Sequence, residues 1–225
     1  MAPPVSDRVY RSLLDAFADG RYAPGDKLPT QRALAARLGV NMSGIREALK
    51  RLEQLGLIDV RHGDAMRVRD WREGAGLDVV AHFLLSGDRP PVADLMEARR
   101  LMLAQAARLG AERRTDAGAA RLRELAGELA VTTDTPAAQA LDYAFFDELV
   151  TASANVVFRL VMNSIRNVYF EHAGLFAAVV RDPAGLAPHY ARAAEAIATR
   201  DADAAEAAVA TLARAQERRL EEALA

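Results

Sequence analysis

Apolar residues recur every three to four positions in two stretches of the N-terminal quarter of the chain, which predicts two helices. Thr30 can cap the first helix and Gly39 can end it. Asn41 can cap the second helix and Gly56 can end it. The apolar stripe of the second helix consists of Ile45, Ala48, Leu49, Leu52 and Leu55. Two helices joined by a tight turn are typical of a helix-turn-helix.

The spacing of polar and apolar residues also predicts a basic face on the second helix and a β-hairpin after it. Arg46 and Lys50 lie four residues apart, on a face of the second helix that points away from its apolar stripe. Residues 57–60 and 65–69 alternate like two short strands around a turn at 62–64. A helix-turn-helix followed by a wing predicts DNA binding. The alternative is a small helical domain whose charged face only interacts with solvent.

From residue 77 onward the pattern predicts helices and no strand. We expect them at about 77–86, 92–114, 116–130, 136–153, 156–181, 186–199 and 202–222. Residues 156–181 carry apolar side chains on most sides, so that helix should be central. The predicted fold is mainly α: a winged helix-turn-helix with a small β-hairpin in residues 1–70, a linker at 71–76, and an antiparallel all-α effector bundle of six to seven helices in residues 77–225.

Charge and composition agree with a DNA-binding head on a separate body. Residues 1–70 hold 12 Lys and Arg against 9 Asp and Glu, whereas the remainder holds 17 against 22. A mildly basic head on an acidic body suits a protein that presents only its head to phosphates. The chain has no Cys, which excludes disulfides and thiolate metal sites. We also expect no membrane segment and a cytoplasmic location.

Polar residues on otherwise apolar helices are the candidates for a ligand site in the bundle. Each one alone is better explained by packing or by a surface position. Together, one arginine and several tyrosines could hold an anionic head group above an apolar tail. The candidates are Arg99, Asp142, Tyr143, Asn163, Tyr169 and Tyr190.

The head resembles the winged helix of GntR-type bacterial transcription regulators. The similar residues are LPTQRALAARLGVNMSGIREALKRLEQLGLI at 28–58, followed closely by RHG at 61–63. The resemblance supports Arg32 and Arg46 as base readers, because a guanidinium can bond guanine O6 and N7 together. It also places Asn41, Met42, Ser43, Gly44, His62 and Gly63 at the DNA, beside the exposed Lys50. We expect a homodimer on a palindromic double-stranded operator.

The body resembles the effector domain of the FadR-type branch of these regulators. The matching segments are EAR at 97–99, LDYAFF at 141–146, ASAN at 152–155 and AIATRDADAAEAA at 196–208. The resemblance implies a small-molecule effector, with Arg99 as a binding residue. A long-chain fatty acyl-CoA or fatty acid is the preferred ligand class, and a small carboxylate is the alternative.

No metal, other cofactor or catalytic activity is expected. Many effector domains of this branch resemble one another in a metal site of one Asp and three His. Here Asp142 remains, but Phe146, Tyr190 and Leu212 stand at the three His positions, and His189 is one residue out of place. No nucleophile and base lie at catalytic spacing, which argues against an enzyme. A winged helix used as a protein-interaction module is a further alternative.

Overall fold

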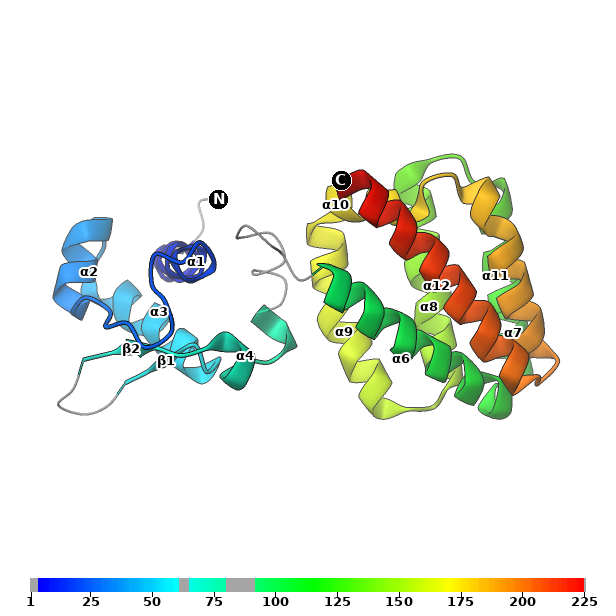
Figure 1. Cartoon of the computed structure of the whole chain (residues 1–225), viewed down its shortest axis with the longest axis horizontal. Helices are drawn as coiled ribbons and strands as arrows, with labels where there is room; N and C mark the ends of the chain where they lie inside the picture. The colour runs from blue at the N-terminus through cyan, green and yellow to red at the C-terminus, as the bar shows by residue number, and fades with distance from the viewer. Residues whose placement is uncertain (1–3, 61–64, 80–91, 225) are drawn as a thin grey trace. The chain divides into compact units, whose positions relative to one another are not determined.

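The computed structural model describes residues 4–60, 65–79 and 92–224, and the chain divides into two compact units, residues 1–91 and 92–225. Unit 1 begins with three helices (Figure 1). They are α1 (Val5–Ala18), α2 (Gln31–Leu38) and α3 (Met42–Gln54). The short strands β1 (Ile58–Asp59) and β2 (Arg67–Val68), helix α4 (Trp71–Gly74) and the 3-10 helix η1 (Leu77–Val79) follow.

The predicted helix-turn-helix is confirmed, and its caps form as the sequence indicates. The Thr30 hydroxyl accepts a hydrogen bond from the Ala33 amide at 3.2 Å, at the start of α2. Gly39 ends α2 in the left-handed region, with φ of 63°. The Asn41 side chain accepts a hydrogen bond from the Gly44 amide at 2.8 Å. The turn between α2 and α3 is therefore set by local side-chain chemistry.

The wing is an antiparallel pair in which Ile58 lies opposite Val68. The strands are shorter than predicted, and the turn expected at 62–64 lies outside the described residues. The segment before α2 pairs with the other edge of β2. The Leu28 amide donates to the Met66 carbonyl at 2.8 Å, and the Val68 amide donates to the Asp26 carbonyl at 3.0 Å. These bonds attach the wing to the approach of the helix-turn-helix.

The segment predicted as a linker, 71–76, is partly helical and packs on unit 1. Asp70 caps α4 by accepting a hydrogen bond from the Arg72 amide at 3.0 Å. Gly56, with φ of 71°, lies so close to α4 that an added Cβ would be 2.3 Å from the Gly74 carbonyl oxygen. Only glycine fits both this backbone conformation and this approach. The two glycines of this segment, Gly74 and Gly76, suggested a linker, whereas the cap that starts the short helix is Asp70, just before it.

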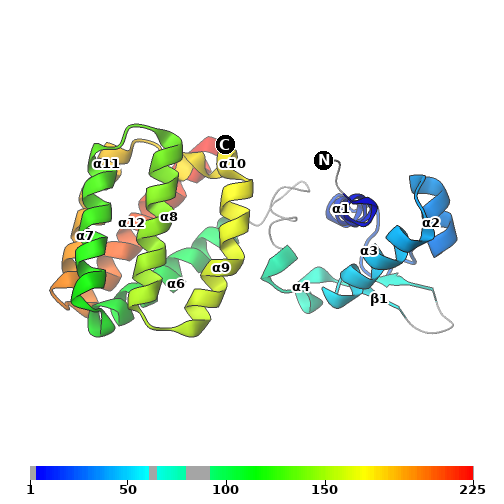
Figure 2. The same cartoon turned by 180° about the vertical axis from the view of Figure 1, so that it is seen from behind.

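Unit 2 holds six long helices in its described residues, arranged in two layers (Figures 1 and 2). One layer contains α9, α8 and α7, and the other contains α6, α12 and α11. Their bounds are α6 (Val92–Arg113), α7 (Asp116–Val131), α8 (Thr135–Ala152), α9 (Val156–Glu171), α11 (Pro183–Ala198) and α12 (Ala202–Leu224). The short helix α10 (Ala173–Phe176) and the 3-10 helix η2 (Ala177–Val180) join α9 to α11.

The boundaries of these helices follow from caps present in the sequence. The side chains of Thr115, Asp134, Asp182 and Asp201 each accept a hydrogen bond from a first-turn amide of the following helix. The fold class predicted from the sequence, a winged helix-turn-helix followed by a helical bundle, is confirmed. None of the helices in the described ranges has an apolar stretch that could cross a membrane.

The expectation that residues 156–181 form a central helix is wrong. The helix ends at Glu171, and α9 lies at the edge of its layer beside α8 (Figure 2). Met162 and Tyr169 face inward and are buried, whereas Val157 and Leu160 are 60% and 59% exposed. Apolar residues on most sides therefore reflect two different apolar faces, of which only one is covered by the bundle.

Candidate DNA-binding face and effector cavity

Helix α3 presents one polar face to solvent. Ser43, Arg46 and Lys50 are exposed and recur at helical spacing, while the Ile45–Leu52 stripe on the other side is buried in the core of unit 1. Arg32 of α2 is exposed as well. The helix therefore keeps its basic side chains away from the core that orients it.

Hydrogen bonds and ion pairs distinguish the basic side chains that stabilise the fold from those that are free to contact DNA. Arg37 donates to the Tyr22 hydroxyl at 3.0 Å, and Arg51 lies 3.3 Å from an Asp7 oxygen and over the Tyr10 ring. Within the described part of the chain, Arg32, Arg46 and Lys50 have no hydrogen-bond or ion-pair partner from their side chains. Those three remain available to an external acceptor such as a phosphate or a base edge.

The other residues predicted at the DNA have mixed surroundings. Asn41 is exposed and caps α3, and Met42 is half-buried. Gly44 is buried, and an added Cβ would lie 2.8 Å from a methyl group of Val5. Gly44 therefore has a packing role against α1. His62 and Gly63 lie outside the described residues, so their part in the interface stays a prediction.

In unit 2, a buried carboxylate on α8 accepts hydrogen bonds from side chains of three other helices, α9, α11 and α12. Asp142 of α8 is 1% exposed. Its Oδ1 accepts hydrogen bonds from the Tyr190 hydroxyl at 2.5 Å and from Gln216 Nε2 at 2.6 Å. Its Oδ2 accepts one from the Tyr169 hydroxyl at 3.1 Å. We call these residues, together with Arg99, the Asp142 cluster.

Arg99 completes the cluster but keeps one donor unused. Its Nη2 donates to Gln216 Oε1 at 2.9 Å and lies 3.9 Å from Asp142 Oδ2. The guanidinium carbon is 4.6 Å from the centre of the Phe146 ring. Its Nη1 is buried, and no hydrogen-bond acceptor reaches it from the described residues. An unused buried donor is costly, so this atom is the natural partner for an oxygen of a bound ligand.

The cluster borders a small cavity of about 30 Å³, room for about two water molecules. Arg99, Asp142 and Tyr169 form its polar end. Apolar side chains line most of the rest, from α6, α8 and α9: Met102, Leu103, Phe146, Met162 and Ile165. Drug-sized ligands occupy about 300–1,000 Å³. A larger ligand must therefore displace the walls.

The structure brings most of the predicted effector residues together. Arg99, Asp142, Tyr169 and Tyr190 belong to the cluster, and Tyr143 lines the cavity beside it. Asn163 is exposed on the far side of α9 and does not belong to the site, which corrects that prediction. The reason is its helical angle, one residue after the inward-facing Met162.

Gln216 is a member that the sequence reasoning missed. It is fully buried on α12 and also donates to the Tyr190 hydroxyl at 2.8 Å. Its signal was present, because Gln216 lies one turn from Leu212 and one turn from Leu220 on the apolar stripe of α12. A polar residue within such a stripe requires a partner.

The three residues that stand at the expected metal-ligand positions are aromatic or aliphatic groups. Phe146 and Leu212 are buried in the core, and Tyr190 bonds the carboxylate directly. In the described ranges, no three His, Cys, Asp or Glu residues gather closely enough to hold a metal ion. The absence of a bound metal in solution stays a prediction.

We expect the two buried tyrosines to make the protein sensitive to alkali. Burial, and then the Asp142 charge, raise the pKa of both Tyr169 and Tyr190. Above about pH 10 the unfolded chain loses these protons while the folded chain keeps them. Each such tyrosine then lowers the free energy of unfolding by about 1.4 kcal/mol per pH unit. Urea denaturation should show that the free energy of unfolding falls less steeply with pH above pH 10 in Tyr190→Phe than in the wild type. Equal dependence on pH in the two proteins would contradict the assignment.

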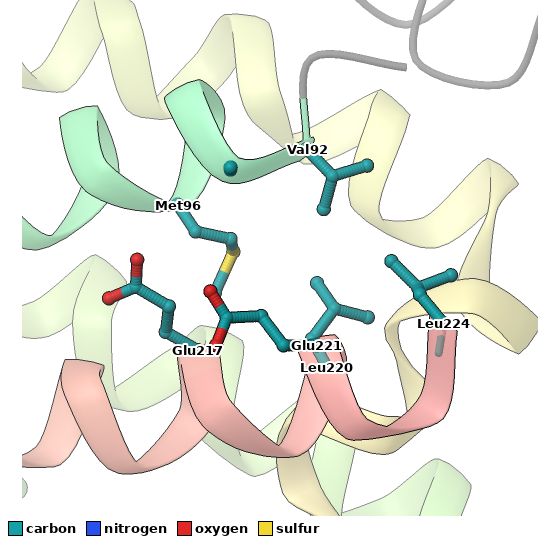
Figure 3. A pocket seen from close by; sticks show the side chains of 7 residues that line it. Val92, Met96, Glu217, Leu220, Glu221 and Leu224 are labelled. Atoms are coloured by element: carbon teal, nitrogen blue, oxygen red, sulfur yellow. The ribbon is translucent and has the colours of Figure 1, made fainter. Parts of the chain in front are cut away.

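A larger hollow lies between the start of α6 and the end of α12 (Figure 3). It has a volume of about 310 Å³. Val92 and Met96 face Leu220 and the carboxylates of α12 across it (Figure 3). Two of its lining residues, Glu217 and Glu221, are acidic. Glu217 is paired with Arg100 at 3.4 Å, and Glu221 adds a second carboxylate that disfavours an anionic ligand in this hollow. The smaller cavity instead offers the Arg99 guanidinium to a fatty acid or carboxylate.

Two family models match the two units. The model described as bacterial regulatory proteins, gntR family, matches residues 5–68, and that of the FCD domain matches residues 94–215. The chain is 32% identical to the HTH-type transcriptional regulator Mce2R of Mycobacterium tuberculosis, over 88% of this chain and 83% of that protein. It is 30% identical to a fatty acid metabolism regulator protein of Yersinia pestis, over 70% and 66% of the two chains. The solved structure of a Streptococcus agalactiae GntR matches 95% of this chain and 97% of that one, with 25% identity and a TM-score of 0.52.

Proposed function

The chain belongs to the gntR family of bacterial regulatory proteins with an FCD domain, and we propose that a ligand in the cavity beside Arg99 controls its binding to an operator. As a member of this family it is a DNA-binding transcription regulator with an effector-binding domain, and it is not an enzyme. The observation that carries the proposal is the unused Nη1 donor of Arg99 at the polar end of an otherwise apolar cavity.

For the DNA contact we propose that α3 enters the major groove. Its exposed Arg46 and Lys50, together with Arg32 of α2, have no competing partner in the described structure. A guanidinium can bond guanine bidentately, whereas a lysine contacts phosphate as a point charge. We further propose that the protein acts in the cytoplasm as a homodimer on a palindrome, because two heads double the contact area.

For the effector we propose a long-chain fatty acid or its acyl-CoA thioester. An oxygen of the head group would accept from Arg99 Nη1, and the chain would lie along Met102, Met162 and Ile165. Asp142 already accepts three hydrogen bonds, so it stays satisfied beside the ligand. Methionine side chains change rotamer easily and let an apolar cavity expand. The similarity to a fatty acid metabolism regulator protein supports the same class.

A small carboxylate is the second candidate, and one observation favours it. The cavity holds only about 30 Å³ in its present shape, far less than an acyl chain needs. A compact carboxylate would require a smaller displacement of α9. Both candidates share the contact with Arg99 and differ in how much apolar wall they use.

Ligand-induced stabilisation distinguishes the two candidates. We expect a saturating long-chain acyl-CoA to stabilise the protein by about 2.7 kcal/mol at one hundred times its dissociation constant. This gain should disappear in Arg99→Met. Arg100→Met is the matched control, because Arg100 is the next residue on α6 but does not line the cavity. Thermal unfolding with each ligand provides the measurement. Stabilisation by short dicarboxylates alone would overturn the acyl proposal, and an equal gain in Arg99→Met would overturn the site.

A further inference from the structure

Both polar atoms of the buried Gln216 amide have hydrogen-bond partners. The oxygen Oε1 accepts from Arg99 Nη2 at 2.9 Å. The nitrogen Nε2 donates to Asp142 Oδ1 at 2.6 Å and to the Tyr190 hydroxyl at 2.8 Å. An arginine only donates hydrogen bonds, and an ionised carboxylate only accepts them. The amide therefore satisfies both neighbours in one orientation alone, with its oxygen toward Arg99 and its nitrogen toward Asp142.

This amide bridges Arg99 to Asp142 in place of a direct hydrogen bond between them. Arg99 Nη2 lies 3.9 Å from Asp142 Oδ2, which is beyond hydrogen-bonding distance. An arginine beside a carboxylate commonly forms a bidentate pair with two parallel N–H···O bonds. Such a pair through the two terminal nitrogens would use Nη1. In the part of unit 2 that the structure describes, Nη1 instead has no acceptor, and Arg99 and Asp142 both line the polar end of the cavity.

We infer that Gln216 is a positioning residue that keeps Arg99 from closing onto Asp142 and so preserves Nη1 as a donor for the ligand. Gln216 itself does not line the cavity, so it acts through Arg99. The Phe146 ring, 4.6 Å from the guanidinium carbon, supports the same side chain. A donor that is held ready before binding reduces the cost of ordering it at binding. The role of Nη1 toward a ligand rests on the proposed function, whereas the separation of Arg99 from Asp142 does not.

Removing the Gln216 amide is expected to weaken ligand binding, although no residue that lines the cavity is changed. In Gln216→Met, Arg99 Nη2 and Asp142 Oδ1 each lose a partner, so the two side chains should pair directly. Binding then requires this pair to open, and the apparent dissociation constant rises by the inverse of the open fraction. We expect palmitoyl-CoA to bind Gln216→Met about ten-fold or more weakly than the wild type, as measured by isothermal titration calorimetry.

Gln139→Met is the matched control for this substitution. Gln139 is another buried glutamine of unit 2, 6% exposed, and its Nε2 donates to the Ala173 carbonyl at 2.8 Å. It belongs to α8 but does not line the cavity. Gln139→Met also loses a hydrogen bond of a buried glutamine, yet it should bind palmitoyl-CoA like the wild type. An equal loss of affinity in the two variants would indicate a general effect on packing and overturn the inference.

A second substitution distinguishes positioning from simple destabilisation. Asp142→Asn removes the charge that would capture Arg99. It keeps Oδ1 as an acceptor for Tyr190 and offers an N–H group to the Tyr169 hydroxyl. We therefore expect Asp142→Asn to restore palmitoyl-CoA affinity in the Gln216→Met background, by a larger factor than any gain it gives in the wild type. An equal gain in the two backgrounds, or a further loss in the double variant, would contradict the inference.

The crystal structure of ligand-free Gln216→Met tests the positioning role without any ligand. We expect Arg99 to form a bidentate pair with Asp142 through Nη1 and Nη2. An Arg99 that stays apart from Asp142 would overturn the inference, even if ligand binding falls. If the wild type does not bind palmitoyl-CoA, the proposed effector class fails, whereas a paired Arg99 in the variant would still support the positioning role of Gln216.

Discussion

Replacing Asp142 by alanine is expected to lower the free energy of unfolding of unit 2 by about 3–5 kcal/mol. The substitution removes the acceptor of three buried donors, from Tyr169, Tyr190 and Gln216. It also leaves the Arg99 charge without its nearest carboxylate, 3.9 Å away. A buried charge that loses its partner costs more than the pair contributed. Urea denaturation followed by circular dichroism measures the change, because unit 2 contains most of the helices.

Asp147→Ala is the control for this prediction. Asp147 is on the same helix and pairs with Arg159, but its side chain is 38% exposed. A solvent-exposed ion pair contributes about 0–1 kcal/mol. If Asp142→Ala and Asp147→Ala had the same small effect, the Asp142 cluster would not be a buried polar core.

Replacing Arg46 by alanine is expected to weaken specific DNA binding by about 1–3 kcal/mol, which is about 5- to 150-fold. Arg46 is exposed on α3, and its guanidinium has no partner in the described structure. If it reads a guanine, the variant should also lose preference at one base pair of each half-site. Fluorescence anisotropy on duplexes that the wild type selects from a random pool provides the affinity.

Two further variants provide the comparison needed to interpret the effect of Arg46→Ala. Lys50→Ala should weaken binding to all duplexes alike and reduce the salt dependence of binding, because the variant loses a phosphate contact. Arg21→Ala is the matched arginine control, because Arg21 pairs with Asp19 before the helix-turn-helix. Unchanged affinity and sequence preference in Arg46→Ala would remove Arg46 from the interface.

Much of the fold was predictable because the sequence carries local signals for it. Thr30, Asn41, Thr115 and Asp134 each cap the helix that follows them, and the predicted boundaries fall near the observed ones. The position of α9 was not predictable in the same way. Hydrophobic spacing identifies an apolar face but not whether the chain's own core covers it, so Leu160 and Met162 look alike in the sequence.

The effector cavity was predictable only in part. Arg99 and Asp142 stood out in the sequence as polar residues on otherwise apolar helices, and the structure places Arg99 Nη2 3.9 Å from Asp142 Oδ2, a contact that the sequence did not predict. Gln216 was overlooked because a single glutamine in an alanine-rich helix is also common on a surface. The small size of the cavity depends on how Met102 of α6 meets Met162 and Ile165 of α9, and the spacing of residues along one helix does not contain this information.

The most direct test of ligand control is the effect of long-chain acyl-CoA on operator affinity, measured by anisotropy in the wild type and in Arg99→Met. A ligand shifts DNA binding only by its differential affinity for the free and DNA-bound states. We predict that saturating acyl-CoA raises the dissociation constant for the selected duplex about ten-fold or more in the wild type, a coupling of about 1.4 kcal/mol. Arg99→Met should bind DNA normally and not respond. Unchanged wild-type affinity while acyl-CoA occupies the FCD domain would contradict the account.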